Sequence, residues 1–298
     1  MRVSVLGLGS HEISCATSVK DVSWLLHSAL DAGINLIDTA ECYGRSEELI
    51  GRSVDHRRGD YYLFTKCGHG HAAGLDLPDW HPHLLMVSIE RSLRRLRTDY
   101  LDVVQLHNCP RAILRRGEVI EVLQQARQAG KVRYLGYSGD REDALAAVLC
   151  GAFDTLQITV NVADQEAIDR ILPSTRESGI GVIAKHPLAN VAWIGGSAEN
   201  DPTRQIYRRR LRKLNYSFLQ QETQRAVAHA LRFTLSIPGV DVVLVGTTKP
   251  QRIYQNLASV AEGPLSEEQF ESIRSRWQTV TRWRKWIPGS RYGWRARI

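Results

Sequence analysis

The 298-residue sequence has no run of about 18 uninterrupted apolar residues, and we therefore expect no membrane-spanning helix. It has only five cysteines, an odd number without the spacing of a disulfide framework. The N-terminus also lacks the charged segment, apolar run and cleavage site that mark a secretion signal. Together these absences favour a cytoplasmic protein in a reducing environment.

The sequence does have an excess of positive charge, +7 overall, and it is concentrated in two segments. The first contains Arg204, Arg208, Arg209, Arg210, Arg212 and Lys213; the second contains Arg282, Arg284, Lys285, Arg291, Arg295 and Arg297. A solvated basic surface is the simple explanation, and attraction of an anionic ligand or a nucleic acid is the alternative. Because no nucleic-acid-binding motif accompanies these residues, we favour a phosphate-bearing cofactor over DNA or RNA.

Short apolar segments alternate with amphipathic segments along the whole chain. The expected strands are Arg2–Leu8, Ile34–Asp38, Tyr61–Lys66, Leu101–His107, Val132–Ser138, Thr155–Ile158, Gly181–Lys185 and Val242–Val245. The expected helices are Val19–Ala32, Glu47–Val54, Pro82–Leu96, Glu118–Ala129, Arg141–Leu149, Glu166–Glu177, Glu222–Ser236 and Pro250–Ala261. Eight strand–helix repeats predict an α/β protein with a single (β/α)8 TIM barrel domain over residues 1–298. An open doubly wound sheet is the alternative, but it seldom has so regular an eightfold count.

Two segments exceed this repeat. A long loop, His186–Gln221, follows the seventh strand, and loops of such length are usually functional or mobile. An extra C-terminal helix is expected over Ser266–Arg284, beginning with a capping box. The tail beyond it carries Trp283, Trp286 and Trp294, which we expect to pack on the barrel surface or near the cleft.

Ionisable and polar residues lie where the expected strands end, the place where barrel enzymes hold their active sites. In chain order these are Asp38, Lys66, His107, Ser138 and Gln157, and Tyr43 follows in the loop after the second strand. A free phenol titrates near 10; a nearby ammonium lowers that pKa, and a buried carboxylate keeps the ammonium charged. We therefore expect Asp38 and Lys66 to make Tyr43 a proton donor to a carbonyl oxygen that His107 also binds. The hydride for such a reaction requires a nicotinamide cofactor, because side chains cannot supply it.

Five segments that together span most of the chain resemble the aldo-keto reductase superfamily: Gly33–Gly44, Phe64–Lys66, Ser88–His107, Gly130–Ser138 and Gly246–Asn256. The resemblance implies that Tyr43 is the general acid, that Asp38 and Lys66 tune it, and that His107 orients the substrate carbonyl. It also implies nicotinamide contacts for Gly9, Ser10, Asp38, Ser138 and Gln157.

The same resemblance places the adenosine end of the cofactor at the last repeat. Gly246, Thr247 and Thr248 end the eighth strand before a helix, where backbone N–H groups suit a phosphate. Arg252 occupies the position of the family's 2′-phosphate arginine, with Gln255 and Asn256 at the adenine. We therefore expect NADP(H) rather than NAD(H), with NAD as the alternative.

Several positions depart from the family pattern. Gly139 stands where many members have Asn, and Gly246 replaces a lysine of the mammalian-type members. Lys185 and His186 stand where many relatives have an aromatic that stacks on the nicotinamide; we expect His186 to replace it, with Leu188 also at the cofactor. The N-terminal hairpin that plugs the barrel in relatives is expected to be short or absent.

Two other motifs in the sequence match their patterns only in part. Gly7-Leu8-Gly9-Ser10 lacks the third glycine of a Rossmann fingerprint. The cysteines near His107 and the group His69, His71, His81 and His83 lack the paired spacing of a structural zinc site, so no metal is expected.

The sequence thus predicts an NADP(H)-dependent oxidoreductase that interconverts an aldehyde, ketone or sugar carbonyl with an alcohol. The alternatives are an NAD-dependent sugar dehydrogenase and a cofactor-sensing regulatory subunit with little turnover. A nucleic-acid binder that uses the basic segments is a third class, which salt-dependent DNA binding would reveal.

Overall fold

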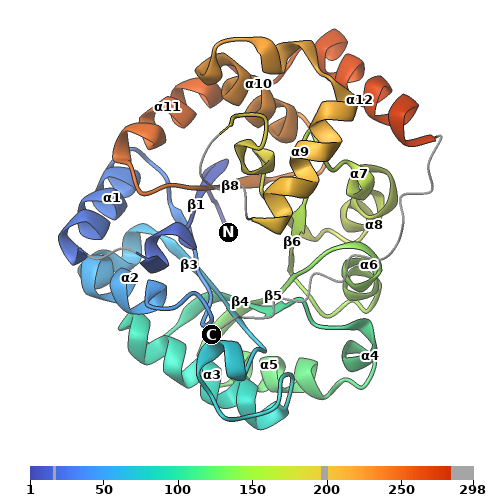
Figure 1. The fold of residues 1–298 in the computed structure, drawn as a ribbon. Helices are drawn as coiled ribbons and strands as arrows, with labels where there is room; N and C mark the ends of the chain where they lie inside the picture. Colours follow the sequence, from blue (N-terminus) through green and yellow to red (C-terminus); the bar gives the residue numbers. More distant parts are fainter. Residues whose placement is uncertain (16–17, 196–200, 283–298) are drawn as a thin grey trace.

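Eight parallel strands form a closed barrel at the centre of the protein (Figure 1). The structure is a computed structural model and describes residues 1–15, 18–195 and 201–282. The strands are β1 (Leu6–Gly9), β2 (Leu36–Asp38), β3 (Tyr62–Cys67), β4 (Leu101–His107), β5 (Val132–Ser138), β6 (Thr155–Thr159), β7 (Gly181–Lys185) and β8 (Val242–Gly246). Each strand pairs with the next, and β8 pairs with β1. The predicted (β/α)8 barrel is confirmed.

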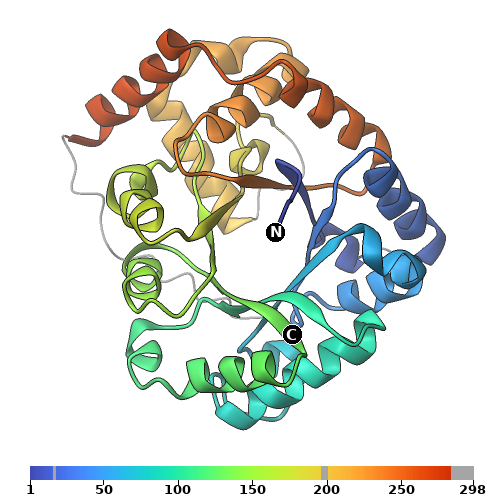
Figure 2. The same ribbon diagram turned by 180° about the vertical axis from the view of Figure 1, so that it is seen from behind.

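Most of the helices form a ring around the outside of the barrel in both views, and α9 lies inside that ring (Figures 1 and 2). The helices are α1 (Val19–Asp31), α2 (Ser46–Val54), α3 (Pro82–Leu96), α4 (Arg111–Leu114), α5 (Glu118–Gln128), α6 (Arg141–Leu149), α7 (Glu166–Arg170), α8 (Leu172–Glu177), α9 (Pro202–Leu214), α10 (Thr223–Leu235), α11 (Pro250–Ala261) and α12 (Glu267–Arg282). The 3₁₀ turns are η1 (Glu12–Cys15), η2 (Asp55–Asp60), η3 (His71–Ala73), η4 (Ala189–Val191) and η5 (Ser217–Gln220). The single helix expected over Glu166–Glu177 is two helices, because Pro173 has no N–H for a continuous ladder. No described helix is long and apolar enough to cross a membrane.

The strand periodicity explains how the barrel positions polar groups. Side chains of successive strand residues point to opposite faces, so every second residue faces the barrel interior. A compact apolar cluster inside the barrel includes Leu36, Phe64 and Val103. Two residues further along the same inward rows stand Asp38, Lys66 and Gln105. The side chains inside the barrel therefore change from apolar to polar and charged over two residues of each strand, close to its carboxyl end.

The opposite end of the barrel is closed by the first residues of the chain. The first strand begins at Leu6 and not at Arg2, so the expected start was wrong. Arg2 N instead donates to Tyr62 Oη (3.3 Å), and Ser4 N donates to Asn35 Oδ1 (2.7 Å). Val3 packs on the apolar cluster inside the barrel. We expected the N-terminal hairpin that plugs the barrel in relatives to be short or absent. This short segment lies at that end of the barrel instead.

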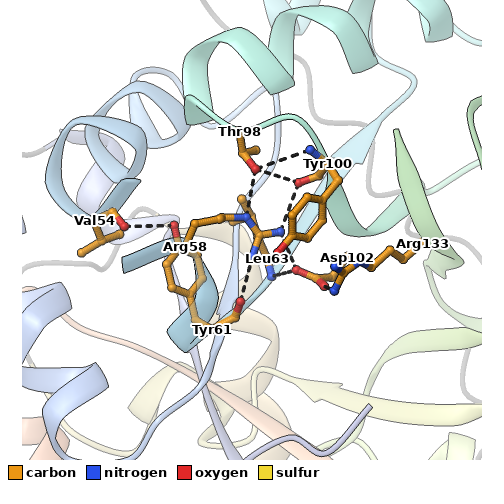
Figure 3. Close-up of polar contacts among 8 residues, drawn as sticks. All are labelled: Val54, Arg58, Tyr61, Leu63, Thr98, Tyr100, Asp102 and Arg133. Carbon is orange, nitrogen blue, oxygen red and sulfur yellow. Dashed lines mark hydrogen bonds and ion pairs between the residues drawn. The ribbon is translucent and has the colours of Figure 1, made fainter. Parts of the chain in front are cut away.

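A polar cluster around Asp102 joins β3, β4 and β5 where these strands begin (Figure 3). The fully buried Asp102 carboxylate accepts bonds from Arg58 Nη2 (2.6 Å), Leu63 N (2.9 Å) and Arg133 Nη1 (3.1 Å). The guanidinium carbons of the two arginines lie 4.1 and 3.9 Å from the centre of the Tyr100 ring. Both carboxylate oxygens are thus satisfied, which a buried charge requires.

The long connection after β7 is folded, because it contains η4, α9 and η5. Part of its basic segment stabilises the fold: Arg210 Nη1 lies 2.5 Å from Asp164 Oδ2, and Arg204 Nη2 donates to Ile194 O (2.9 Å). The exposed basic residues of α9 are Arg209, Arg212 and Lys213, and these form its solvated basic face. Of the C-terminal basic segment only Arg282 is described; the rest of it, together with Trp283, Trp286 and Trp294, lies outside the described residues.

Candidate active site

The structure brings the four expected catalytic residues together at the carboxyl end of the barrel. Lys66 Nζ lies 2.5 Å from Asp38 Oδ1 and also donates to Thr39 O (2.7 Å). The same nitrogen lies 4.9 Å from the centre of the Tyr43 ring. The rings of Tyr43 and His107 meet edge to face, with their centres 5.9 Å apart. An ion pair, a phenol and an imidazole thus share one small volume.

The Asp38 carboxylate is held by two amides as well as by Lys66. Its Oδ2 accepts from Gln157 Nε2 (2.8 Å) and Gln105 Nε2 (3.0 Å), and Ser138 Oγ donates to Gln157 Oε1 (3.0 Å). These hydrogen bonds compensate the cost of burying the carboxylate. Sequence reasoning missed Gln105, although its place two residues before His107 on an inward-facing row could have revealed it.

The pKa of Tyr43 differs from our expectation. We expected Lys66 to lower it, yet it lies well above the ordinary value, because burial disfavours the phenolate and the negative charges of Asp38 and Glu12 oppose it further. Asp38, so close to Lys66, neutralises much of the ammonium's field. Tyr43 is therefore a neutral phenol at neutral pH, which is the form that can donate a proton.

His107 is also neutral. Burial lowers its pKa well below the ordinary value, and the positive charges of Lys66 and Lys185 lower it further. A neutral imidazole carries one N–H and one bare nitrogen. The ring nitrogen Nδ1 of His107 lies 3.5 Å from Cys42 Sγ.

Further aromatic and histidine side chains surround this pair. The His11 ring contacts Tyr43 with 4.9 Å between centres, and His69 contacts His107 at 5.2 Å. Trp80 packs edge-on against His69 (5.3 Å) and fills the space beside Gly68, where a Cβ would lie 2.0 Å from the Trp80 ring. The sequence reasoning singled out neither His11 nor Trp80; it placed the His69–His83 loop at the substrate entrance and weighed His69 itself as a zinc ligand.

A buried acid, Glu41, ties the Tyr43 loop to the next loop of the barrel. Its Oε1 accepts from the backbone N–H groups of Gly68 (2.9 Å) and His69 (3.3 Å), and its Oε2 accepts from the Ser88 hydroxyl. Arg91 Nη2 lies 3.6 Å away. Burial, partly offset by these contacts, raises the pKa of Glu41 to about 8. The sequence gives no signal for this role, because the partners come from α3 and from the loop between β3 and α3.

The residues expected at the nicotinamide end differ in their surroundings. Gly9 pairs in register with Asp38 and with Gly246 at the mouth of the barrel. Ser10 is fully buried, and its hydroxyl accepts from Ser46 Oγ (2.8 Å), so it lies behind the strand ends. Ser138 and Gln157 are buried beside Asp38.

Departures from the family pattern lie at the ends of β5 and β7. A Cβ at Gly139 would lie 2.6 Å from the Tyr137 ring, so that ring takes the space an asparagine side chain would need. Lys185 Nζ pairs with Asp140 Oδ2 (3.2 Å). His186 is exposed and has a left-handed backbone (φ 54°). Leu188, just before η4, is half-buried.

The expected adenosine end lies at the start of α11. Thr247 is buried and its Oγ1 accepts from Lys249 N (3.0 Å), while Thr248 is exposed. Arg252 and Gln255 are exposed on α11, and Asn256, one turn after Arg252, is buried. At Gly246 the Glu12 carboxylate fills the space of a side chain, since a Cβ there would lie 2.1 Å from Glu12 Oε2.

Comparison with known proteins places the chain in a family. A sequence model described as "Aldo/keto reductase family" matches residues 5–278. The chain is 28% identical to the uncharacterized oxidoreductase YqkF of Bacillus subtilis, over 92% of each chain. It is also 28% identical to the L-galactose dehydrogenase of Arabidopsis thaliana, over 88% of this chain and 86% of that one.

Among solved structures, the holo form of the aldo-keto reductase AKR11C1 from Bacillus halodurans has the same fold. Its TM-score is 0.78 at 24% identity, and the match covers 93% of each chain. The family match over residues 5–278 and the strand-end residues of a closed eight-stranded barrel point to one conclusion. This chain is an oxidoreductase that belongs to the aldo/keto reductase family.

Proposed function

We propose that this protein is an NADP(H)-dependent oxidoreductase that interconverts a carbonyl compound and an alcohol, with Tyr43 as the general acid and base. The observation that carries the proposal is the buried Asp38–Lys66 ion pair next to the Tyr43 ring, with the neutral His107 ring in edge-to-face contact with Tyr43. A charge pair of this kind is costly to bury. Stabilisation of a Tyr43 phenolate during proton transfer is a function that would account for its presence.

In the reduction, Tyr43 would donate its proton to the substrate oxygen. The Lys66 ammonium would stabilise the phenolate that remains, and Asp38 would keep that ammonium charged. His107 would donate its single N–H to the same oxygen. In the reverse direction the phenolate would accept the proton of the alcohol.

The residues present fit a nicotinamide dinucleotide. Arg252 is exposed in the first turn of α11 and has no ion-pair partner in the part of the chain that the structure describes. A free cation beside a helix N-terminus favours a phosphate. Ser138 and Gln157 would hold the carboxamide, with Asn256 and Gln255 at the adenine. Bound NADPH would supply the hydride.

A second candidate is an NAD-dependent sugar dehydrogenase. One relative is named L-galactose dehydrogenase, and at Gly246 this chain has the Glu12 carboxylate where other members carry a lysine. An acid disfavours a phosphate nearby and suits sugar hydroxyls. A regulatory subunit is less well supported, since all four residues of the proton-transfer group are in contact.

A panel of aldehydes, ketones and aldoses, tested with NADPH and NADH, examines the proposal. We expect NADPH oxidation by the wild type, and a loss of about 10²–10⁴ in kcat for Tyr43→Phe. The matched control is Tyr134→Phe, which changes an exposed tyrosine on the outside of β5. Cofactor binding without turnover would favour a regulatory subunit, and sugar oxidation with NAD alone would favour the second candidate.

A further inference from the structure

Cys42 immediately precedes Tyr43 and contacts the other proposed substrate-binding group, His107. Its Sγ lies 3.5 Å from His107 Nδ1, within the range of a hydrogen bond that involves sulfur. Both side chains are half-buried. Cys42 comes from the loop after β2 and His107 from the end of β4, so the contact exists only in the folded barrel.

The protonation states of the two groups limit the arrangements of this bond. Burial raises the pKa of the Cys42 thiol to about 12, so the group is an S–H and not a thiolate. His107 is neutral and has one N–H. Either the thiol donates to a bare Nδ1 and Nε2 carries the proton, or Nδ1–H donates to sulfur and Nε2 is bare.

The chemistry of the two atoms favours the first arrangement. Thiol sulfur is a weak acceptor, whereas the bare nitrogen of a neutral imidazole is a good one. The hydrogen bond made by one ring nitrogen determines which nitrogen carries the proton. Within the described ranges no other group hydrogen-bonds to the His107 ring. The ring contacts made by Tyr43 and His69 are edge-to-face and leave the tautomer undecided.

We propose that Cys42 is a positioning residue whose thiol holds His107 as the Nε2–H tautomer. This tautomer directs a donor, and not an acceptor, from Nε2 toward a substrate oxygen. The part of the inference that concerns substrate rests on the proposed carbonyl chemistry, while the tautomer itself does not.

The tautomer can be measured in the cofactor-free protein by long-range ¹H–¹⁵N correlation spectra of histidine-labelled samples. His107→Gln identifies the His107 signals. We expect the Nε2–H pattern in the wild type and in Cys42→Ser, whose hydroxyl also donates. In Cys42→Ala the ratio of tautomers should move toward Nδ1–H by about fivefold, the effect of one ordinary hydrogen bond. Cys150→Ala, which changes an exposed cysteine, is the matched control.

An Nδ1–H pattern in the wild type, or an unchanged ratio in folded Cys42→Ala, would overturn the proposal. Kinetics test the link to substrate: we expect kcat to fall about fivefold in Cys42→Ala, to recover in Cys42→Ser, and the Kd for NADPH to stay unchanged. A shifted tautomer with an unchanged kcat would refute that link. A shifted tautomer in a protein that reduces no carbonyl would refute the proposed function and leave the tautomer assignment standing.

Discussion

The buried Asp38–Lys66 pair should show strong coupling in a double-mutant cycle of stability. Lys66→Met leaves the buried Asp38 carboxylate without its cation but with its two amide donors, Gln105 and Gln157. Breaking a buried pair costs about 3–5 kcal/mol, and the two amides place this variant near the lower limit. Asp38→Asn leaves the buried Lys66 ammonium without a counter-charge, although Thr39 O and the new amide oxygen can still accept from it, so we expect a similar loss.

The double variant removes both charges and should be no less stable than either single variant. The coupling energy is then at least about 3 kcal/mol, measured as the free energy of unfolding in urea by circular dichroism. The exposed pair Lys131 and Glu90 is the matched control, with an expected coupling of about 0–1 kcal/mol. Additive losses at Asp38 and Lys66 would refute the assumption that the two side chains form one neutralised unit.

The same three variants separate structure from chemistry. If Lys66 stabilises the Tyr43 phenolate, carbonyl reduction should be lost in both single variants and should stay lost in the double variant. Recovery of stability without recovery of kcat is therefore the expected outcome. Recovery of both would mean that the ion pair serves the fold alone.

Three other changes test separate parts of the structure. The raised pKa of Glu41, about 8 against 4.5, means that the folded state retains a proton that the unfolded state has lost, so its contribution to stability is complete below pH 4.5 and disappears as the pH rises through 8. The free energy of unfolding should therefore fall more between pH 5 and pH 8.5 for the wild type than for Glu41→Gln. An equal fall in the two proteins would contradict the raised pKa of Glu41. Asp102→Ala should lower the free energy of unfolding by about 3–5 kcal/mol, because Arg58 loses its buried partner. The control Asp60→Ala removes an exposed ion pair and should lower it by at most about 1 kcal/mol. Equal losses in urea unfolding would show that the polar cluster around Asp102 does not stabilise the fold. Arg252→Ala should weaken NADPH about tenfold more than NADH in fluorescence titrations, since a charged hydrogen bond contributes about 1.5–3 kcal/mol, and an unchanged preference would remove Arg252 from the 2′-phosphate site.

Local patterns in the sequence were sufficient to predict the barrel and the four clustered residues. Strand and helix periodicity depends on residues near one another in the chain, so the eight repeats were readable, with errors mainly at ends such as Arg2. Asp38, Lys66 and His107 are strand-end residues, and in a parallel barrel all carboxyl ends meet at one face. The prediction that they meet Tyr43 therefore needed only the topology.

The tertiary structure alone decided the environment of these groups. Desolvation depends on atoms contributed by many strands and loops, and for that reason the expected sign of the Tyr43 pKa shift was wrong. The contacts of Glu41 with the Gly68 loop and of Cys42 with His107 join segments 27 and 65 residues apart. Such contacts follow from distances within the folded barrel, which no local pattern of residue types records.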